Sequence, residues 1–167
     1  MTPSASPVSL PRLVASLDTI VTLCDDLCSV LEREREALTE GKDDALALAL
    51  GEKRDRLRRI ATAESEHRKV SAEISNELGL GRVDSSLADL ACRMEGTARD
   101  QLVQAKDNLF KVMKEIGALN QGNARLIRRA QHYNRHLFGI LTGPGADTYG
   151  PDGARRTGAP PVIQKRA

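Results

Sequence analysis

The chain has 167 residues, a net charge of +2, no Trp, two Phe and two Tyr. This length suits one domain, and the scarcity of aromatic residues predicts a thin core of Leu, Ile, Val and Ala rather than an enclosed pocket. The near-neutral charge gives no general attraction to nucleic acid, and no apolar run approaches the roughly 20 residues that span a bilayer.

Residues 1–8 contain two Pro and two Ser, and this composition is typical of a flexible lead. No basic segment precedes an apolar stretch there, so we expect no secretory signal and a cytoplasmic protein. Cys24, Cys28 and Cys92 are odd in number and lack the spacing of a zinc site or a disulfide framework. We expect them to be packing residues in a reducing compartment.

The first two predicted helices cover about residues 9–40 and 44–78, where apolar residues recur at steps of three and four. Ser9 can cap the first helix and Pro11 fits its first turn. Gly41 supplies a left-handed C-cap at its end. Each of these two helices should span roughly 50 Å at 1.5 Å per residue.

The third predicted helix covers about residues 86–141, opens with a capping box at Ser86 and stops before Gly143. Its apolar ladder consists of Leu102, Ala105, Leu109, Val112, Ile116, Leu119, Asn123, Leu126, Ala130, Tyr133, Leu137 and Ile140. Residues 142–167 are rich in Gly and Pro and are predicted to be a disordered tail without strands.

These lengths predict an all-α fold, an elongated antiparallel three-helix bundle or coiled coil with a long projecting third helix. The third helix should reach roughly 80 Å, so residues after Asn120 would extend roughly 30 Å past the other two helices. An apolar stripe without an intramolecular partner indicates protein binding. The chain could instead bend back at Gly117 or Gly122, or the stripe could pair in a homodimer.

The candidate partner-binding residues lie on this last part of the third helix: Leu119, Asn120, Asn123, Leu126, Ile127, Ala130, Tyr133 and Leu137. Asn123 occupies a seam position, where an amide can either set the helix register or bind a partner's backbone. No acidic residue lies between Glu115 and Asp147, whereas four Arg do. This basic stretch can attract an anionic partner, or it can be a solvated face that complements the helix dipole.

No catalytic, cofactor or nucleic-acid motif is visible, so we predict a protein that is not an enzyme and has no cofactor or metal. Glu64 and His67 have the Glu-x-x-His spacing of di-metal bundles. The matching height of the third helix offers Ala98 and Leu102, which cannot bind metal. A helical metalloenzyme is therefore the least favoured class, and the main alternative is a structural coiled-coil protein that self-associates.

Several short motifs in this chain resemble those of FlgN-type flagellar export chaperones. They are Leu31-x-x-Glu34-x-x-Ala37-Leu38 followed by Gly41-Lys42-Asp43, then Leu46, Leu50, Lys53 and Leu57, then Leu87-x-x-Leu90, then Asn120-x-x-Asn123-x-x-Leu126-Ile127, Tyr133 and Leu137, and Tyr149 to Gly153. The segment from Asn120 to Ile127 with the Tyr-containing tail is the most specific part.

This resemblance implies a cytoplasmic chaperone of flagellar type III export, either a monomer or a weak homodimer, without membrane insertion. Its clients would be hook–filament junction proteins, whose aggregation-prone terminal helices it covers before delivery to the export gate. The family's client-binding region corresponds to about Leu119 to Leu141 here. Tyr133 is the residue that the resemblance suggests for the contact with the export gate.

Overall fold

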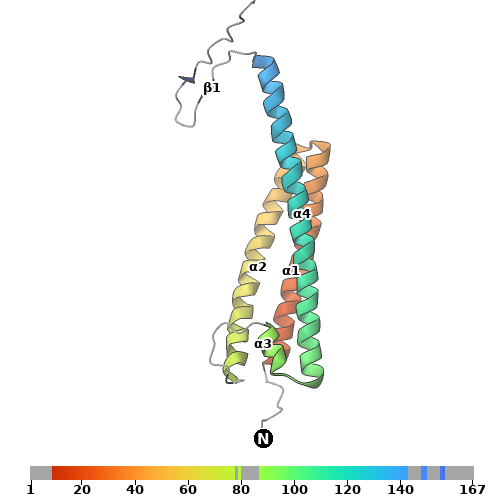
Figure 1. Cartoon of the computed structure of the whole chain (residues 1–167), viewed down its shortest axis with the longest axis vertical. Coiled ribbons are helices and arrows are strands. Elements are labelled where there is room, and N and C mark those ends of the chain that lie inside the picture. The colour runs from red at the N-terminus through yellow and green to blue at the C-terminus, as the bar shows by residue number, and fades with distance from the viewer. Residues whose placement is uncertain (1–8, 78, 80–86, 143–147, 150–154, 157–167) are drawn as a thin grey trace, which may run out of the picture. The chain divides into compact units, whose positions relative to one another are not determined.

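The structure is a computed structural model that describes residues 9–77, 79, 87–142, 148–149 and 155–156. Its elements are α1 (Leu10–Glu40), α2 (Asp43–Glu77), α3 (Leu87–Cys92), α4 (Gly96–Thr142), β1 (Thr148–Tyr149) and β2 (Arg155–Arg156). The predicted all-α fold class is confirmed (Figure 1). The chain divides into two compact units, Met1–Ala124 and Arg125–Ala167.

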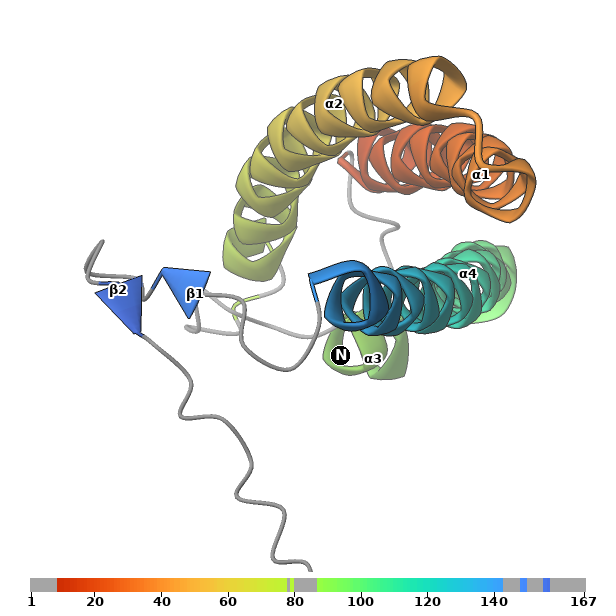
Figure 2. The same ribbon diagram turned by 90° about the horizontal axis from the view of Figure 1, so that it is seen from above.

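The first unit is built on an antiparallel hairpin of α1 and α2. Gly41 ends α1 in the left-handed conformation with φ 68°, and the Lys42 N–H donates to the Ala37 carbonyl over 3.0 Å. Only Gly adopts this conformation without steric cost, which is why the sequence located this turn. Figure 2 shows α2 curving around α1, while α4 lies along another side of α1.

The start of α1 differs from the predicted cap. Pro11 lies in the first turn as expected, but the Ser9 hydroxyl makes no capping bond to a helix N–H. It donates instead to the Glu77 carboxylate at the end of α2. A cap would use the Ser9 hydroxyl oxygen as an acceptor for a helix N–H. Here the hydroxyl is oriented as a donor to a charged carboxylate, which is a stronger type of hydrogen bond.

The predicted single helix over 86–141 is interrupted in the structure. α3 ends in a tight turn, in which Arg93 and Met94 N–H groups donate to Leu90 and Ala91 carbonyls over 3.1 and 3.3 Å. Gly96 then adopts φ 60° and opens α4. The interruption lets Leu90 of α3 join the same core as α4. The predicted helix start at Ser86 lies outside the described residues.

Two clusters form the core of the first unit; α1 and α4 contribute equally to the first, and α1 contributes most to the second. The first joins α1, α2, α3 and α4 and includes Leu13, Leu17, Val70, Ile74, Leu90, Ala98 and Leu102. The second joins α1, α2 and α4 and includes Ile20, Cys24, Leu27, Cys28, Leu31, Ile60 and Val112. Burial raises the pKa of the Cys28 thiol to about 11, so this side chain packs as a neutral group.

α2 contributes less to the core than its apolar ladder suggests. Its buried residues are Ala49, Ile60, Val70, Ile74 and Ser75. Leu57, which continues the three- and four-residue spacing between Lys53 and Ile60, is 48% exposed. Ala49, Ile60 and Ile74 belong to the same pattern and are buried, so only part of this stripe enters the core.

The second unit contains residues 125–142 of α4 and a short antiparallel pair of strands. Thr148 pairs with Arg156, and Tyr149 pairs with Arg155. This pair differs from the prediction of a tail without strands. The other residues of the predicted tail lie outside the described part of the chain.

His67 should make the first unit less stable in mild acid. Its Nδ1 lies 2.9 Å from the Ser16 hydroxyl, and burial lowers the pKa of His67, an effect that the Glu64 charge partly opposes. An unfolded His takes up a proton near pH 6.5, while the folded one resists it, so the free energy of unfolding should fall as the pH drops through about 6.5. Urea denaturation between about pH 7.5 and 5.5 measures this slope. The His67→Gln variant should show a smaller slope, and an unchanged slope would contradict this assignment.

Candidate functional site

The second half of α4 exposes apolar side chains over several turns. Every side chain from Ile127 to Leu141 is exposed. Five of them recur at three- and four-residue spacing on one side of the helix: Ile127, Ala130, Tyr133, Leu137 and Ile140, hereafter the α4 stripe. Tyr133 is 60% exposed and Ile140 is 63% exposed. An exposed apolar stripe of this kind marks an interaction site.

The structure places the eight predicted partner-binding residues in three different environments. Leu119 packs against the second core cluster of the first unit, and Asn123 is buried in that unit. Asn120 is exposed and Leu126 is half-buried. The remaining four, Ile127, Ala130, Tyr133 and Leu137, belong to the α4 stripe.

Asn123 belongs to a buried polar network that joins three helices. Its Nδ2 donates to the Leu31 carbonyl over 2.9 Å and to Glu34 Oε2 over 3.0 Å. Lys53 Nζ donates to both carboxylate oxygens of Glu34, over 2.9 and 3.2 Å. The network connects α1, α2 and α4 at one level, which favours the register interpretation of Asn123 over a contact with a partner.

A basic set of side chains accompanies the α4 stripe. It consists of Arg125, Arg128, Arg129, Arg135, His132 and His136, all of them exposed. The guanidinium of Arg135 donates from Nε to the Gln131 carbonyl over 3.3 Å, within its own helix. The combination of an apolar stripe with basic flanks suits a partner helix that carries acidic side chains.

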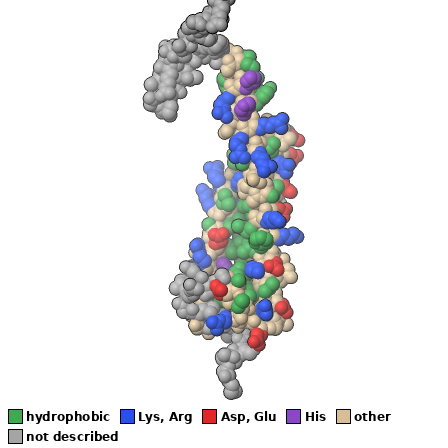
Figure 3. Space-filling view, in the orientation of Figure 1, with side chains coloured by type: hydrophobic (Ala, Val, Ile, Leu, Met, Phe, Trp, Pro, Cys, Tyr) green, Lys and Arg blue, Asp and Glu red, His purple; other side chains and the backbone are tan. Residues whose placement is uncertain are grey.

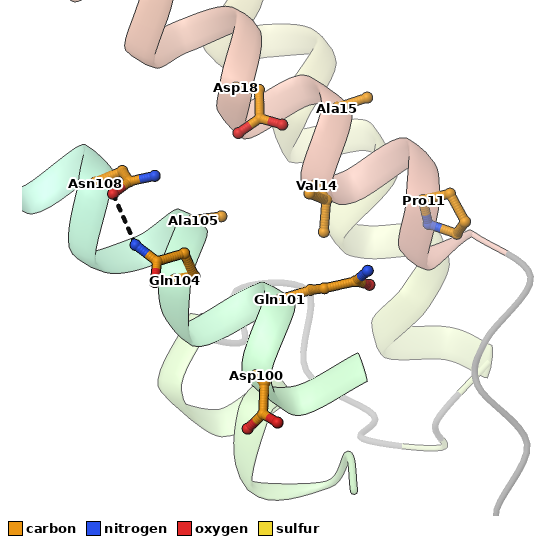
Figure 4. Close-up of a pocket in the computed structure, with 9 residues that line it drawn as sticks. All are labelled: Pro11, Val14, Ala15, Asp18, Asp100, Gln101, Gln104, Ala105 and Asn108. Carbon is orange, nitrogen blue, oxygen red and sulfur yellow. Dashed lines mark hydrogen bonds between the residues drawn. The ribbon is translucent and has the colours of Figure 1, made fainter. Parts of the chain in front are cut away.

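The clearest hollow among the described residues is a groove of about 670 Å³ between α1 and α4 (Figure 4). Pro11, Val14, Ala15 and Asp18 line it from α1, and Asp100, Gln101, Gln104, Ala105 and Asn108 line it from α4. Gln104 Nε2 donates to Asn108 Oδ1 over 3.0 Å, one turn along α4. The lining contains no His, Cys, Ser or Lys, so it offers no nucleophile or general base beyond two carboxylates.

The possible metal-binding side chains are scattered over the described part of the chain. No three His, Cys, Asp or Glu side chains among them cluster as metal ligands would. Glu64 of the Glu-x-x-His pair is exposed, and His67 is hydrogen-bonded to Ser16. None of the described helices combines the length and apolar character that crossing a membrane requires.

Sequence reasoning did not predict the exposed apolar residues of the first unit, which include Leu48 of α2 at 64% exposure. Leu50 and Leu57 of α2 are 42% and 48% exposed, and Phe110 and Met113 of α4 are 71% and 54% exposed. Phe110 and Met113 lie three residues apart beside the main ladder of α4. A second three- and four-residue stripe beside the first was the available signal.

One family model matches the chain, and its description is FlgN protein. The match covers residues 1–157, which include all four helices and both strands. No curated protein and no solved structure shows a significant match to the chain.

Proposed function

Because the chain belongs to the FlgN family of flagellar export chaperones, which bind hook-associated proteins, we propose that its α4 stripe covers an amphipathic terminal helix of a hook–filament junction protein. The client helix would lie along α4, in the mode by which amphipathic helices occupy apolar surfaces. The chaperone would act in the cytoplasm and deliver the client to the export gate.

The single observation that supports this proposal is the exposure of the α4 stripe. An isolated amphipathic helix of about 20 residues is marginally stable in water, so a partner that covers the stripe would also stabilise the helix. Burying about 500 Å² of apolar surface contributes on the order of 10 kcal/mol before the costs of association. Those costs consume much of this gain, which leaves a client that can be released for export.

Tyr133 is the proposed contact with the export gate. It is 60% exposed in the middle of the α4 stripe. A Tyr side chain presents a large apolar ring and a hydroxyl that can donate or accept a hydrogen bond, which suits a specific contact between proteins. A client and the gate would therefore share one surface, and gate docking would follow or accompany client release.

Leu137→Asp should abolish capture of the terminal segments of hook–filament junction proteins in co-purification. The substitution places a charge in the α4 stripe, where desolvation by a bound helix would be unfavourable. Leu48→Asp is the matched control, because Leu48 is 64% exposed on α2 and lies outside the stripe. Equal capture by both variants would remove the α4 stripe from the mechanism.

Self-association through the α4 stripe is the alternative function, and dilution distinguishes it. A self-associating protein should lose helix content and apparent mass as its concentration falls. A chaperone should remain monomeric until client is added. Light scattering of the full chain with and without a client segment measures both outcomes.

A further inference from the structure

The first unit exposes a second apolar surface that involves none of the α4 stripe residues. It consists of Leu50 and Leu57 on α2 and Phe110 and Met113 on α4, hereafter the α2–α4 surface. All four side chains are at least 42% exposed, although each belongs to a helix whose other face is in the core. Large apolar side chains grouped in this way on a soluble protein indicate a contact surface.

The two α2 residues of this surface lie on the side of α2 that faces α4. Leu50, Lys53 and Leu57 are spaced by three and four residues, so they share one face of α2. Lys53 on that face donates to Glu34, and Asn123 of α4 donates to the same carboxylate. Leu50 and Leu57 therefore lie on the side of α2 that turns toward α4.

The two α4 residues of this surface lie on the side of α4 that faces α2. Asn108 lines the groove between α1 and α4, and Phe110 and Met113 lie about 140–160° around the helix from it, at 100° per residue. Arg12 and Ser16 of α1 contact α2, and neither residue lines that groove. The groove and α2 therefore lie on different sides of α1. Phe110 and Met113 thus occupy the flank of α4 on the side of α2.

The apolar residues of the two helices lie at successive heights along one elongated surface. The polar network places Lys53 and Asn123 at one level, and α2 and α4 run in opposite directions. Leu57 then lies about 6 Å and Met113 about 15 Å from that level, in the same direction. The whole surface from Leu50 to Phe110 extends about 25 Å, the length of a helix of about 16 residues. Figure 3 shows apolar side chains gathered between α2 and α4 on this face.

The edges of the α2–α4 surface are predominantly basic. Lys and Arg side chains border it on both helices (Figure 3). The helical spacing places four basic residues beside the apolar ones: Arg54, Arg68, Lys106 and Lys114. It places two acidic residues there, Glu64 and Asp107. Asp107 lies 3.7 Å from Lys106 and offsets it, and no described residue forms an ion pair with Arg54, Arg68 or Lys114. A partner with acidic side chains beside an apolar stripe complements this pattern.

The same charge argument disfavours a second copy of this chain as the occupant. The exposed apolar helix that another copy could offer is the α4 stripe, and its flanks carry Arg125, Arg128, Arg129 and Arg135. No acidic residue lies between Glu115 and Asp147. Docking that stripe on the α2–α4 surface would bring like charges together, which costs binding free energy.

We propose that the α2–α4 surface is a docking site for an acidic amphipathic helix of a partner protein. The helix packs its apolar face on Leu57, Phe110 and Met113, and its carboxylates face the Arg and Lys side chains at the edges. This site is independent of the proposed function, because it shares no residue with the α4 stripe. The protein accordingly has two surfaces that can bind helices, one in each unit.

Fluorescence anisotropy with a labelled peptide tests this proposal on the full chain. The probe is an amphipathic peptide of about 18 residues with Leu at three- and four-residue spacing and Glu on the flanks. A second peptide has Lys in place of every Glu. The Glu peptide should bind at least about tenfold more tightly than the Lys peptide. Raising salt from about 50 mM to about 300 mM should weaken its binding several-fold.

Paired variants assign the binding to its surface. The double variant Leu57→Gln, Phe110→Gln should weaken binding of the Glu peptide at least about tenfold. Leu48→Gln, on another part of α2, and the double variant Tyr133→Gln, Leu137→Gln, in the α4 stripe, should change it less than about twofold. All the replaced residues are at least 38% exposed, so circular dichroism should show the same thermal midpoint for each variant.

Four outcomes would overturn the proposal. The Glu peptide could fail to bind, or the Lys peptide could bind equally well. The α4 stripe variant or Leu48→Gln could lose binding as much as the α2–α4 variant does. Light scattering could show a wild-type dimer that the α2–α4 variant converts to a monomer, which would make a second copy the occupant. If the α4 stripe failed to capture a client, the binding of the Glu peptide to the α2–α4 surface would be unaffected.

Discussion

Replacing Lys53 with Met should lower the free energy of unfolding by about 3–5 kcal/mol. Lys53 is the only basic side chain that bonds to Glu34 among the described residues, and Glu34 is 2% exposed where α1, α2 and α4 meet. Removing the ammonium group would leave a buried carboxylate with only the Asn123 amide as a donor. Urea denaturation followed by circular dichroism measures the loss.

The double variant Lys53→Met, Glu34→Leu is the matched control for this effect. Apolar replacement of both partners removes the buried charge, so the double variant should recover most of the lost stability. The coupling free energy between the two substitutions then measures the interaction between Lys53 and Glu34. If Lys53→Met alone unfolds at the wild-type urea concentration, water reaches Glu34 and the network does not hold the three helices.

Leu102→Ala should lower the free energy of unfolding by about 2–5 kcal/mol, whereas Leu137→Ala should change it by less than about 1 kcal/mol. Both residues belong to one apolar ladder of α4. Leu102 is 0% exposed in the first core cluster, whereas Leu137 is 38% exposed in the α4 stripe. The same substitution therefore creates a cavity at one end of the helix and removes a solvated side chain at the other.

Thermal and urea unfolding of the two variants, measured side by side, test this contrast. Both substitutions put the same good helix former into one helix, so differences in helix propensity cancel. A loss of several kcal/mol from Leu137→Ala would mean that the α4 stripe is covered in the folded protein. The stripe would then be ordinary core, and the proposed client surface would disappear.

Local features predicted the helices well. The expected ranges 9–40 and 44–78 lie within one residue of α1 and α2 at both ends. Gly41 and Pro11 act through the backbone within one turn, so their effects follow from the neighbouring residues alone. The expected third helix contains the interruption after α3, because Met94 and Leu90 pack into a core that other helices provide.

The exposure of the candidate residues was predicted correctly only for the last part of α4. Ile127, Ala130, Tyr133 and Leu137 are exposed as expected, but Asn123 is buried and bonded to Leu31 and Glu34. A seam amide has the same sequence signature whether it faces a partner or a neighbouring helix. Glu34 Oε2 and the Leu31 carbonyl, which lie 89 and 92 residues away in sequence, decided between these possibilities.

The sequence by itself determined a set of amphipathic helices, because helix periodicity and caps depend on residues within four positions of one another. The match of the family model to the sequence placed the chain in the FlgN family. Only the tertiary structure decided which of the apolar stripes are covered. Leu57, Phe110 and Met113 are exposed, whereas other residues of the same helices are buried in the core. Coverage depends on where a second helix crosses the first, and no local pattern encodes that crossing.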